Sequence, residues 1–152
     1  MARHYASEIS MEVQAPAERV FQALTDWSIR SQWRKGIEIQ WEGAPRAFAG
    51  QKVVFHVKGG LFPYRFAFRV TGVEAPHRLF FEYEDGPLKG RAALEVTPQE
   101  KGCKATFHWM KVEPVGAIPR SLFALGWGTA THRVRTQETL RMLQKHLEAS
   151  NS

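Results

Sequence analysis

The stretch that most constrains the fold is the last long one, residues 119–149, which has the pattern of a single amphipathic helix. At about 100° per residue, its leucines gather on one stripe of the helix surface. These leucines are Leu122, Leu125, Leu140, Leu143 and Leu147. The same projection places Thr129, Arg133 and Thr136 in the middle of the stripe, where a pure core helix carries aliphatic side chains. An apolar face with a polar centre predicts one wall of a cavity.

The chain before this helix is dominated by segments in which apolar and polar residues alternate, the pattern of half-buried strands. Strands are predicted over residues 5–13, 37–42, 52–58, 64–70, 79–84, 92–96 and 104–112. A short helix is predicted over residues 16–25, and a second short helix or tight loop over residues 27–35. This order predicts an α+β fold in one domain, residues 1–152, with a meandering antiparallel sheet covered by the terminal helix.

Large aromatic side chains occupy the predicted inward face of several strands. The clearest case is the strand over residues 64–70, in which Tyr64, Phe66 and Phe68 share one face. The strand over residues 104–112 is ambiguous, because both of its faces carry apolar residues. We predict that Ala105, Phe107 and Trp109 point inward, against the competing set Thr106, His108, Met110 and Val112.

Composition limits the function classes. The net charge is +6, but Lys and Arg are scattered among acidic residues, which favours a solvated basic surface over a nucleic-acid interface. The single cysteine, Cys103, excludes an internal disulfide and every multi-cysteine metal site. No apolar run has the length of a membrane span or a signal-peptide core. We therefore expect a cytoplasmic protein; the sequence leaves its oligomeric state open.

The motifs of enzymatic chemistry are missing from the sequence. The histidines lack metal-ligand spacing, and there is no nucleophile elbow and no phosphate-binding glycine loop. Glu38, Glu42, Glu82 and Glu84 fall on predicted solvent faces instead of forming a paired site. We predict no metal, no cofactor and no catalytic residue, and we expect a binding protein in preference to an enzyme.

The segment 13–26, VQAPAERVFQALTD, and the tryptophan segment that follows it as far as Trp33 resemble the start of the Bet v 1/START-like superfamily, also called SRPBCC or polyketide cyclase/dehydrase-like proteins. Weaker matches are residues 73–79 and 102–106. The resemblance implies a helix-grip fold, in which a curved seven-stranded antiparallel sheet grips the long C-terminal helix and two short helices lie between strands 1 and 2. It also implies an elongated apolar cavity but no catalytic residue, because the superfamily has no universal catalytic motif.

The main functional hypothesis is that this cavity binds a hydrophobic or amphipathic small molecule, such as a lipid or polyketide. Arg133 is the predicted polar anchor, because a guanidinium in an apolar stripe needs an anionic partner. Two alternatives account for Arg133 without a ligand: a carboxylate of the sheet pairs with it, or a kink at Gly128 turns it toward solvent. The predicted ligand-binding residues are Trp33, Trp41, Phe55, Tyr64, Phe66, Phe68, Phe81, Tyr83, Phe107, Trp109, Thr129, Arg133 and Thr136.

Two other functions fit the same sequence. A polyketide cyclase/dehydrase-like enzyme would use the pocket to orient a folded chain while a Tyr, His or Arg moves or polarises a proton. An interaction module of stress-response or toxin–antitoxin type would instead use the basic surface to bind a protein or RNA. The sequence does not identify the ligand in any of the three cases.

Overall fold

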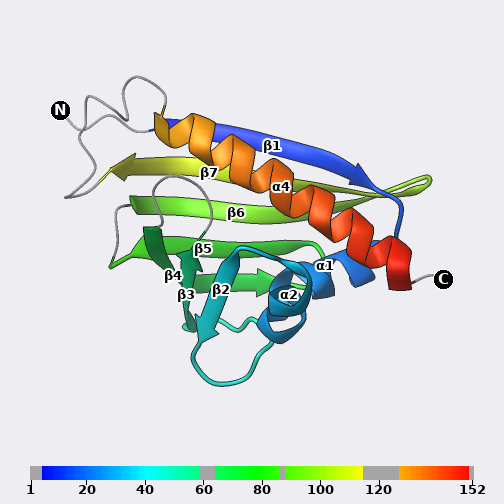
Figure 1. Cartoon of the computed structure of the whole chain (residues 1–152), viewed down its shortest axis with the longest axis horizontal. Coiled ribbons are helices and arrows are strands. Elements are labelled where there is room, and N and C mark those ends of the chain that lie inside the picture. The colour runs from blue at the N-terminus through cyan, green and yellow to red at the C-terminus, as the bar shows by residue number, and fades with distance from the viewer. Residues whose placement is uncertain (1–4, 59–63, 86–87, 115–126, 151–152) are drawn as a thin grey trace.

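Seven antiparallel strands form one curved sheet, and a long helix lies across its concave side (Figure 1). The computed structural model describes residues 5–58, 64–85, 88–114 and 127–150. The strand order is β1-β7-β6-β5-β4-β3-β2, so β1 and β2 are the two edges. The strands are β1 (Tyr5–Val13), β2 (Ile37–Trp41), β3 (Lys52–Val57), β4 (Tyr64–Glu74), β5 (Arg78–Glu84), β6 (Leu88–Gln99) and β7 (Gly102–Pro114). The predicted α+β helix-grip fold is confirmed.

Two short helices, α1 (Ala17–Thr25) and α2 (Trp27–Trp33), connect β1 to β2. Asp26 separates them. Its carboxylate accepts hydrogen bonds from the backbone N–H groups of Ser28 at 3.1 Å and Ile29 at 3.2 Å, so it caps the start of α2. The chain therefore changes direction at one residue, and α2 turns a face toward the inside of the sheet.

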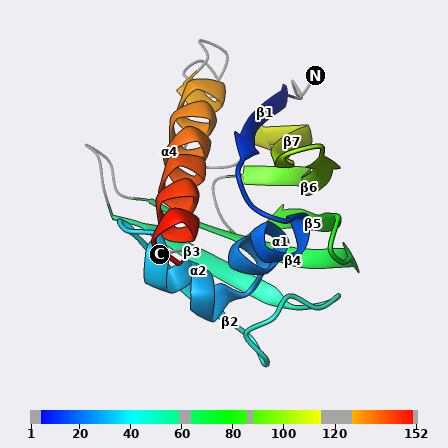
Figure 2. The same cartoon turned by 90° about the vertical axis from the view of Figure 1, so that its right-hand side faces the viewer.

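The C-terminal helix α4 (Trp127–Ser150) packs through its C-terminal half. Leu140, Leu143 and Leu147 are buried, and α4 contacts β1, β7, α1 and α2. Figure 2 shows α4 standing beside the open side of the curved sheet, with its C-terminal end next to α1 and α2. The predicted leucine stripe is confirmed at these three positions. Leu122 and Leu125 lie outside the described residues.

The prediction that Arg133 lies in the middle of the buried stripe is wrong, because Arg133 is exposed. Val134 beside it is also 57% exposed, whereas Thr136 is 7% exposed. A permanently charged guanidinium is costly to desolvate without a partner, so it fits the end of the stripe that solvent reaches. Thr136 and Thr139 are the buried polar side chains among the described residues of α4.

Strand β7 presents both of its faces to the interior in turn. Ala105 and Trp109 are buried as predicted, and Phe107 is half-buried. Val112 is also buried, because the pairing of β7 slips by one residue at Met110: Ala92 lies opposite Trp109, whereas Arg91 lies opposite Lys111. This β-bulge leaves Met110 47% exposed. Beyond the bulge the alternation of side chains is shifted by one residue, so Val112 points into the core.

Candidate functional site

Seven aromatic side chains form a continuous series of ring contacts, which we call the aromatic array. Neighbouring ring centroids in it lie 4.4 to 6.5 Å apart, mostly in edge-to-face or tilted arrangements. Its members are Trp27, Phe55, Phe66, Phe68, Phe81, Tyr83 and Trp109. They come from α2, β3, β4, β5 and β7, so the array lines the concave face from one side to the other.

Small residues on β6 allow the array to continue between β5 and β7, which flank it. Gly90 lies opposite Tyr83, and Ala92 lies opposite Trp109. A larger side chain at either position would stand between the two rings. The rings of Tyr83 and Trp109 therefore meet above β6.

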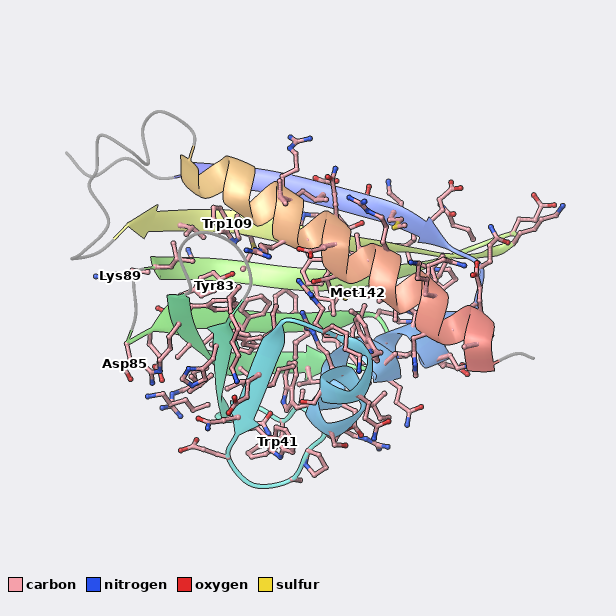
Figure 3. All side chains as sticks on the ribbon, in the orientation of Figure 1. Trp41, Tyr83, Asp85, Lys89, Trp109 and Met142 are labelled. Atoms are coloured by element: carbon pink, nitrogen blue, oxygen red, sulfur yellow. The ribbon has the colours of Figure 1, made fainter. Side chains whose placement is uncertain are left out.

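Tyr83 and Trp109 place polar atoms within this apolar surface. The indole Nε1 of Trp109 donates a hydrogen bond of 3.0 Å to the Tyr83 hydroxyl, and both side chains are buried. Figure 3 shows the two side chains together on the sheet, at the end nearer the start of α4. The array therefore contains a hydrogen-bonded pair of polar groups among its apolar rings.

The opposite end of the array is fixed by α2. Trp27 is fully buried, and its Nε1 donates a hydrogen bond of 2.8 Å to Oε1 of Gln51. The Gln51 amide in turn donates to the backbone carbonyls of Glu42 and Ala44. These bonds give hydrogen-bond partners to the Trp27 indole N–H and to the Gln51 amide, so Trp27 has a defined orientation against Phe55 and Phe68.

Arg30, also on α2, places a positive charge on the array. Its guanidinium carbon lies 5.2 Å from the Phe55 ring centroid and 6.0 Å from that of Trp27, and the residue is only 9% exposed. Burial, and secondarily the neighbouring charge of Arg34, lowers the pKa of Arg30 to about 9; Tyr83 acts weakly in the opposite direction. Arg30 therefore remains protonated at neutral pH.

Arg34, one turn further along the same face, ties the α2 end of the chain to α4. Its Nε donates a hydrogen bond of 2.7 Å to Thr139 Oγ1, and its Nη2 lies 3.6 Å from a carboxylate oxygen of Glu138. Arg34 is 2% exposed. Its charge therefore has a carboxylate and a hydroxyl partner within the chain, and its contacts are those of a residue that fastens two elements together.

Six of the predicted aromatic ligand-binding residues meet in the array, and three described ones do not. Trp33 is buried against His146 of α4, with ring centroids 6.1 Å apart, and its Nε1 donates to the Ala23 carbonyl. Trp41 is half-buried on the edge strand β2 (Figure 3). Phe107 is half-buried on β7, opposite Ile9 and Leu94. The side chains of Tyr64 and Thr129 lie outside the described residues.

A groove of about 540 Å³ runs along the β2 edge, and none of the residues that line it belongs to the aromatic array. Trp41, Ile37 and Ile39 supply its apolar lining, and Lys35 and Lys58 are among its basic residues. It accounts for the partial exposure of Trp41, which therefore belongs to a different surface from Tyr83 and Trp109.

Sequence reasoning missed Trp27, Arg30 and Arg34 as residues of this region. The signal was present, because these positions are three and four residues apart and share one face of a helix. Arg is seldom fully buried, so a pattern search assigns both arginines to solvent and treats the two tryptophans of the segment as its apolar groups.

Two further classes of feature were sought in the described part of the chain. No group of three or more His, Cys, Asp or Glu side chains is arranged there to hold a metal ion. None of the described helices has the length and apolar character needed to cross a membrane.

Several solved structures share this fold. They include TTHA0849 from Thermus thermophilus, at 16% identity and a TM-score of 0.75, covering 97% of this chain and 100% of that one. A protein from Rhizobium leguminosarum matches at 16% identity and a TM-score of 0.72, covering 98% and 97%. DynU16, a protein of the dynemicin biosynthetic locus, matches at 20% identity and a TM-score of 0.68, covering 95% of this chain and 48% of that one. At these identities the likeness concerns the fold alone.

A comparison with curated protein sequences gives no significant match. The family model described as polyketide cyclase / dehydrase and lipid transport matches residues 5–148, which is nearly the whole chain. This match agrees with the curved seven-stranded sheet, the two short helices after β1 and the C-terminal helix. The chain therefore belongs to the polyketide cyclase / dehydrase and lipid transport family.

Proposed function

We propose that the protein binds a hydrophobic or amphipathic small molecule between the concave face of the sheet and α4. The observation that carries this proposal is the aromatic array, which presents rings from five elements on one surface and includes a Tyr–Trp hydrogen bond. Ligand sites are typically apolar and aromatic, with a few polar groups that set orientation. The family description, which includes lipid transport, supports the same function.

The small residues of β6 support this reading of the array as a binding surface. Gly90 and Ala92 lie beneath the part of the sheet where Tyr83 and Trp109 meet. A sheet that only had to pack tightly against α4 would gain from larger apolar side chains there, because burial of each additional methylene stabilises by about 0.8 kcal/mol. Gly90 has a φ of 131°, which itself favours glycine, so the support comes from Ala92, which forgoes that gain.

The experiment is a titration of the protein with dodecanol and with dodecanoate, followed by tryptophan fluorescence and native mass spectrometry. We expect a one-to-one complex with at least one of the two compounds and a change in emission, because Trp27 and Trp109 belong to the array. Native mass spectrometry of the protein as purified tests for a molecule carried from the cell. Absence of binding to both compounds, with no co-purifying molecule, would refute the proposed function.

A second candidate is a cyclase/dehydrase-like activity on a β-keto chain. The Tyr83 hydroxyl favours it, because this group lies in the apolar array, where it could donate or accept a proton. Turnover of a β-keto thioester that is lost in Tyr83→Phe, while binding of dodecanol persists, would support this activity. The cytoplasmic location and the interaction-module alternative stay predictions from the sequence.

A further inference from the structure

The guanidinium of Arg30 is the buried charge of the aromatic array. It reaches the array from α2 and lies over the rings of Phe55 and Trp27. Arg30 is 9% exposed, so most of its surface is removed from solvent. The positive charge therefore lies against the rings of the aromatic array.

Among the described residues, no carboxylate pairs with the charge of Arg30. Its Nη1 donates a hydrogen bond of 3.2 Å to the Leu24 carbonyl, and its Nε is buried without a hydrogen-bond partner. No ion pair joins Arg30 to an acidic side chain among the described residues. Within that part of the chain, the only strong compensation is the pair of aromatic faces of Trp27 and Phe55.

The neighbouring Arg34 shows how the same fold treats a buried guanidinium whose role is structural. Arg34 has a hydroxyl partner in Thr139 and a carboxylate partner in Glu138, both on α4. The two arginines are four residues apart in the chain and similarly buried, yet only Arg34 has an acidic partner among the described residues. Burying a charge without such a partner costs several kcal/mol in general, which favours recruitment of an anion from outside the chain.

We propose that the ligand is an amphipathic carboxylic acid, that its carboxylate binds the Nε edge of Arg30, and that its apolar part lies along the aromatic array. A guanidinium matches a carboxylate in shape, because its planar N–H groups can donate two parallel hydrogen bonds to the two oxygens. An anion there would also provide the partner that the buried Nε lacks. Because this ligand class rests on the proposed function, the two need separable tests.

The test compares dodecanoate with dodecanol, which share a chain length and differ in charge, by isothermal titration calorimetry. Wild type is expected to bind dodecanoate about 10- to 100-fold more tightly, the range of a charge-assisted hydrogen bond. Arg30→Met is expected to abolish that preference while dodecanol binding changes little. Arg141→Met, on the exposed face of α4, is the matched control and is expected to keep the preference.

The outcomes separate the two proposals. Equal affinity of wild type for the two compounds would overturn the assignment of a carboxylic acid and leave the proposed function standing, and this result needs no variant. Loss of the preference in Arg133→Met but not in Arg30→Met would overturn Arg30 as the anchor. Where Arg30→Met does not fold, Arg30→Lys replaces it, with a weakened preference expected because an ammonium lacks the planar pair of donors. Failure of both compounds to bind, with no molecule co-purifying, would refute the proposed function and the ligand class with it.

Discussion

The indole of Trp109 on β7 and the hydroxyl of Tyr83 on β5 are joined by a hydrogen bond of 3.0 Å that crosses over β6. Their rings also meet edge to face, with centroids 6.5 Å apart. The bond is possible because β6 contributes Gly90 and Ala92 between them. The bond fixes the orientation of the Tyr83 and Trp109 side chains relative to each other.

We expect Tyr83→Phe to lower the free energy of unfolding by about 1–2 kcal/mol, because the indole donor of Trp109 loses its buried partner. Trp109→Phe should cost more, since it also removes ring volume from the core. In a double-mutant cycle measured by urea unfolding and circular dichroism, the coupling energy should be about 0.5–1.5 kcal/mol. Strictly additive losses would show that the bond contributes nothing.

We expect Ala92→Leu to weaken dodecanol binding by about tenfold or more, because the added atoms project from the concave face beside Trp109, where the ligand is proposed to bind. Ala93→Leu is the matched control, since Ala93 is also buried but lies on the opposite face of the same strand. Each variant should lose about 1–3 kcal/mol of stability through overpacking. Equal loss of binding in both would place the ligand elsewhere than the concave face.

We expect Thr139→Val to lower the free energy of unfolding by about 1–3 kcal/mol, because Arg34 Nε loses a buried hydrogen bond of 2.7 Å. Glu138→Gln should cost less than about 1 kcal/mol, since the Glu138 carboxylate is 37% exposed and 3.6 Å away. Thermal unfolding of the two variants compares them directly. A larger loss for Glu138→Gln would mean that the ion pair, and not the hydroxyl, attaches α2 to α4.

The thiol of Cys103 should be unreactive in the folded protein at pH 8, because the residue is fully buried and burial raises its pKa to about 11. An aromatic disulfide reagent should modify it only after urea unfolding. The same shift predicts that stability falls as pH rises from about 9 to 11, where the unfolded thiol ionises and the folded thiol does not. In Cys103→Ala this part of the pH dependence should vanish; rapid labelling of the folded protein would contradict the burial.

The fold was accessible to sequence reasoning because period-two alternation reports which side of a strand is buried. Phe68 and Val70 on β4, and Phe81 and Tyr83 on β5, are buried as their alternation predicts. Val112 was assigned to the wrong side because alternation assumes an unbroken ladder, and the bulge at Met110 breaks it. A bulge of this kind depends on pairing across strands, which a single strand's sequence does not contain.

The polar residues of the site were less accessible for a related reason. An ideal helix projection places Arg133 above Leu140, but only the neighbouring elements decide which residues of α4 they cover. Thr136 is buried, whereas Arg133 is exposed. Arg30 shows the converse error. Its burial depends on Phe55 and Trp27 enclosing it, and these contacts join segments that lie far apart in the sequence.

The claim that a ligand binds on the aromatic array is tested most directly by following the indole N–H resonances in NMR spectra during titration with dodecanoate. The signals of Trp27 and Trp109 should shift, because both rings belong to the array. The signal of Trp33 should stay in place, because its ring stacks on His146 and its N–H is bonded to Ala23. A shift confined to Trp41 would place the ligand in the β2 groove, and it would contradict binding between the sheet and α4.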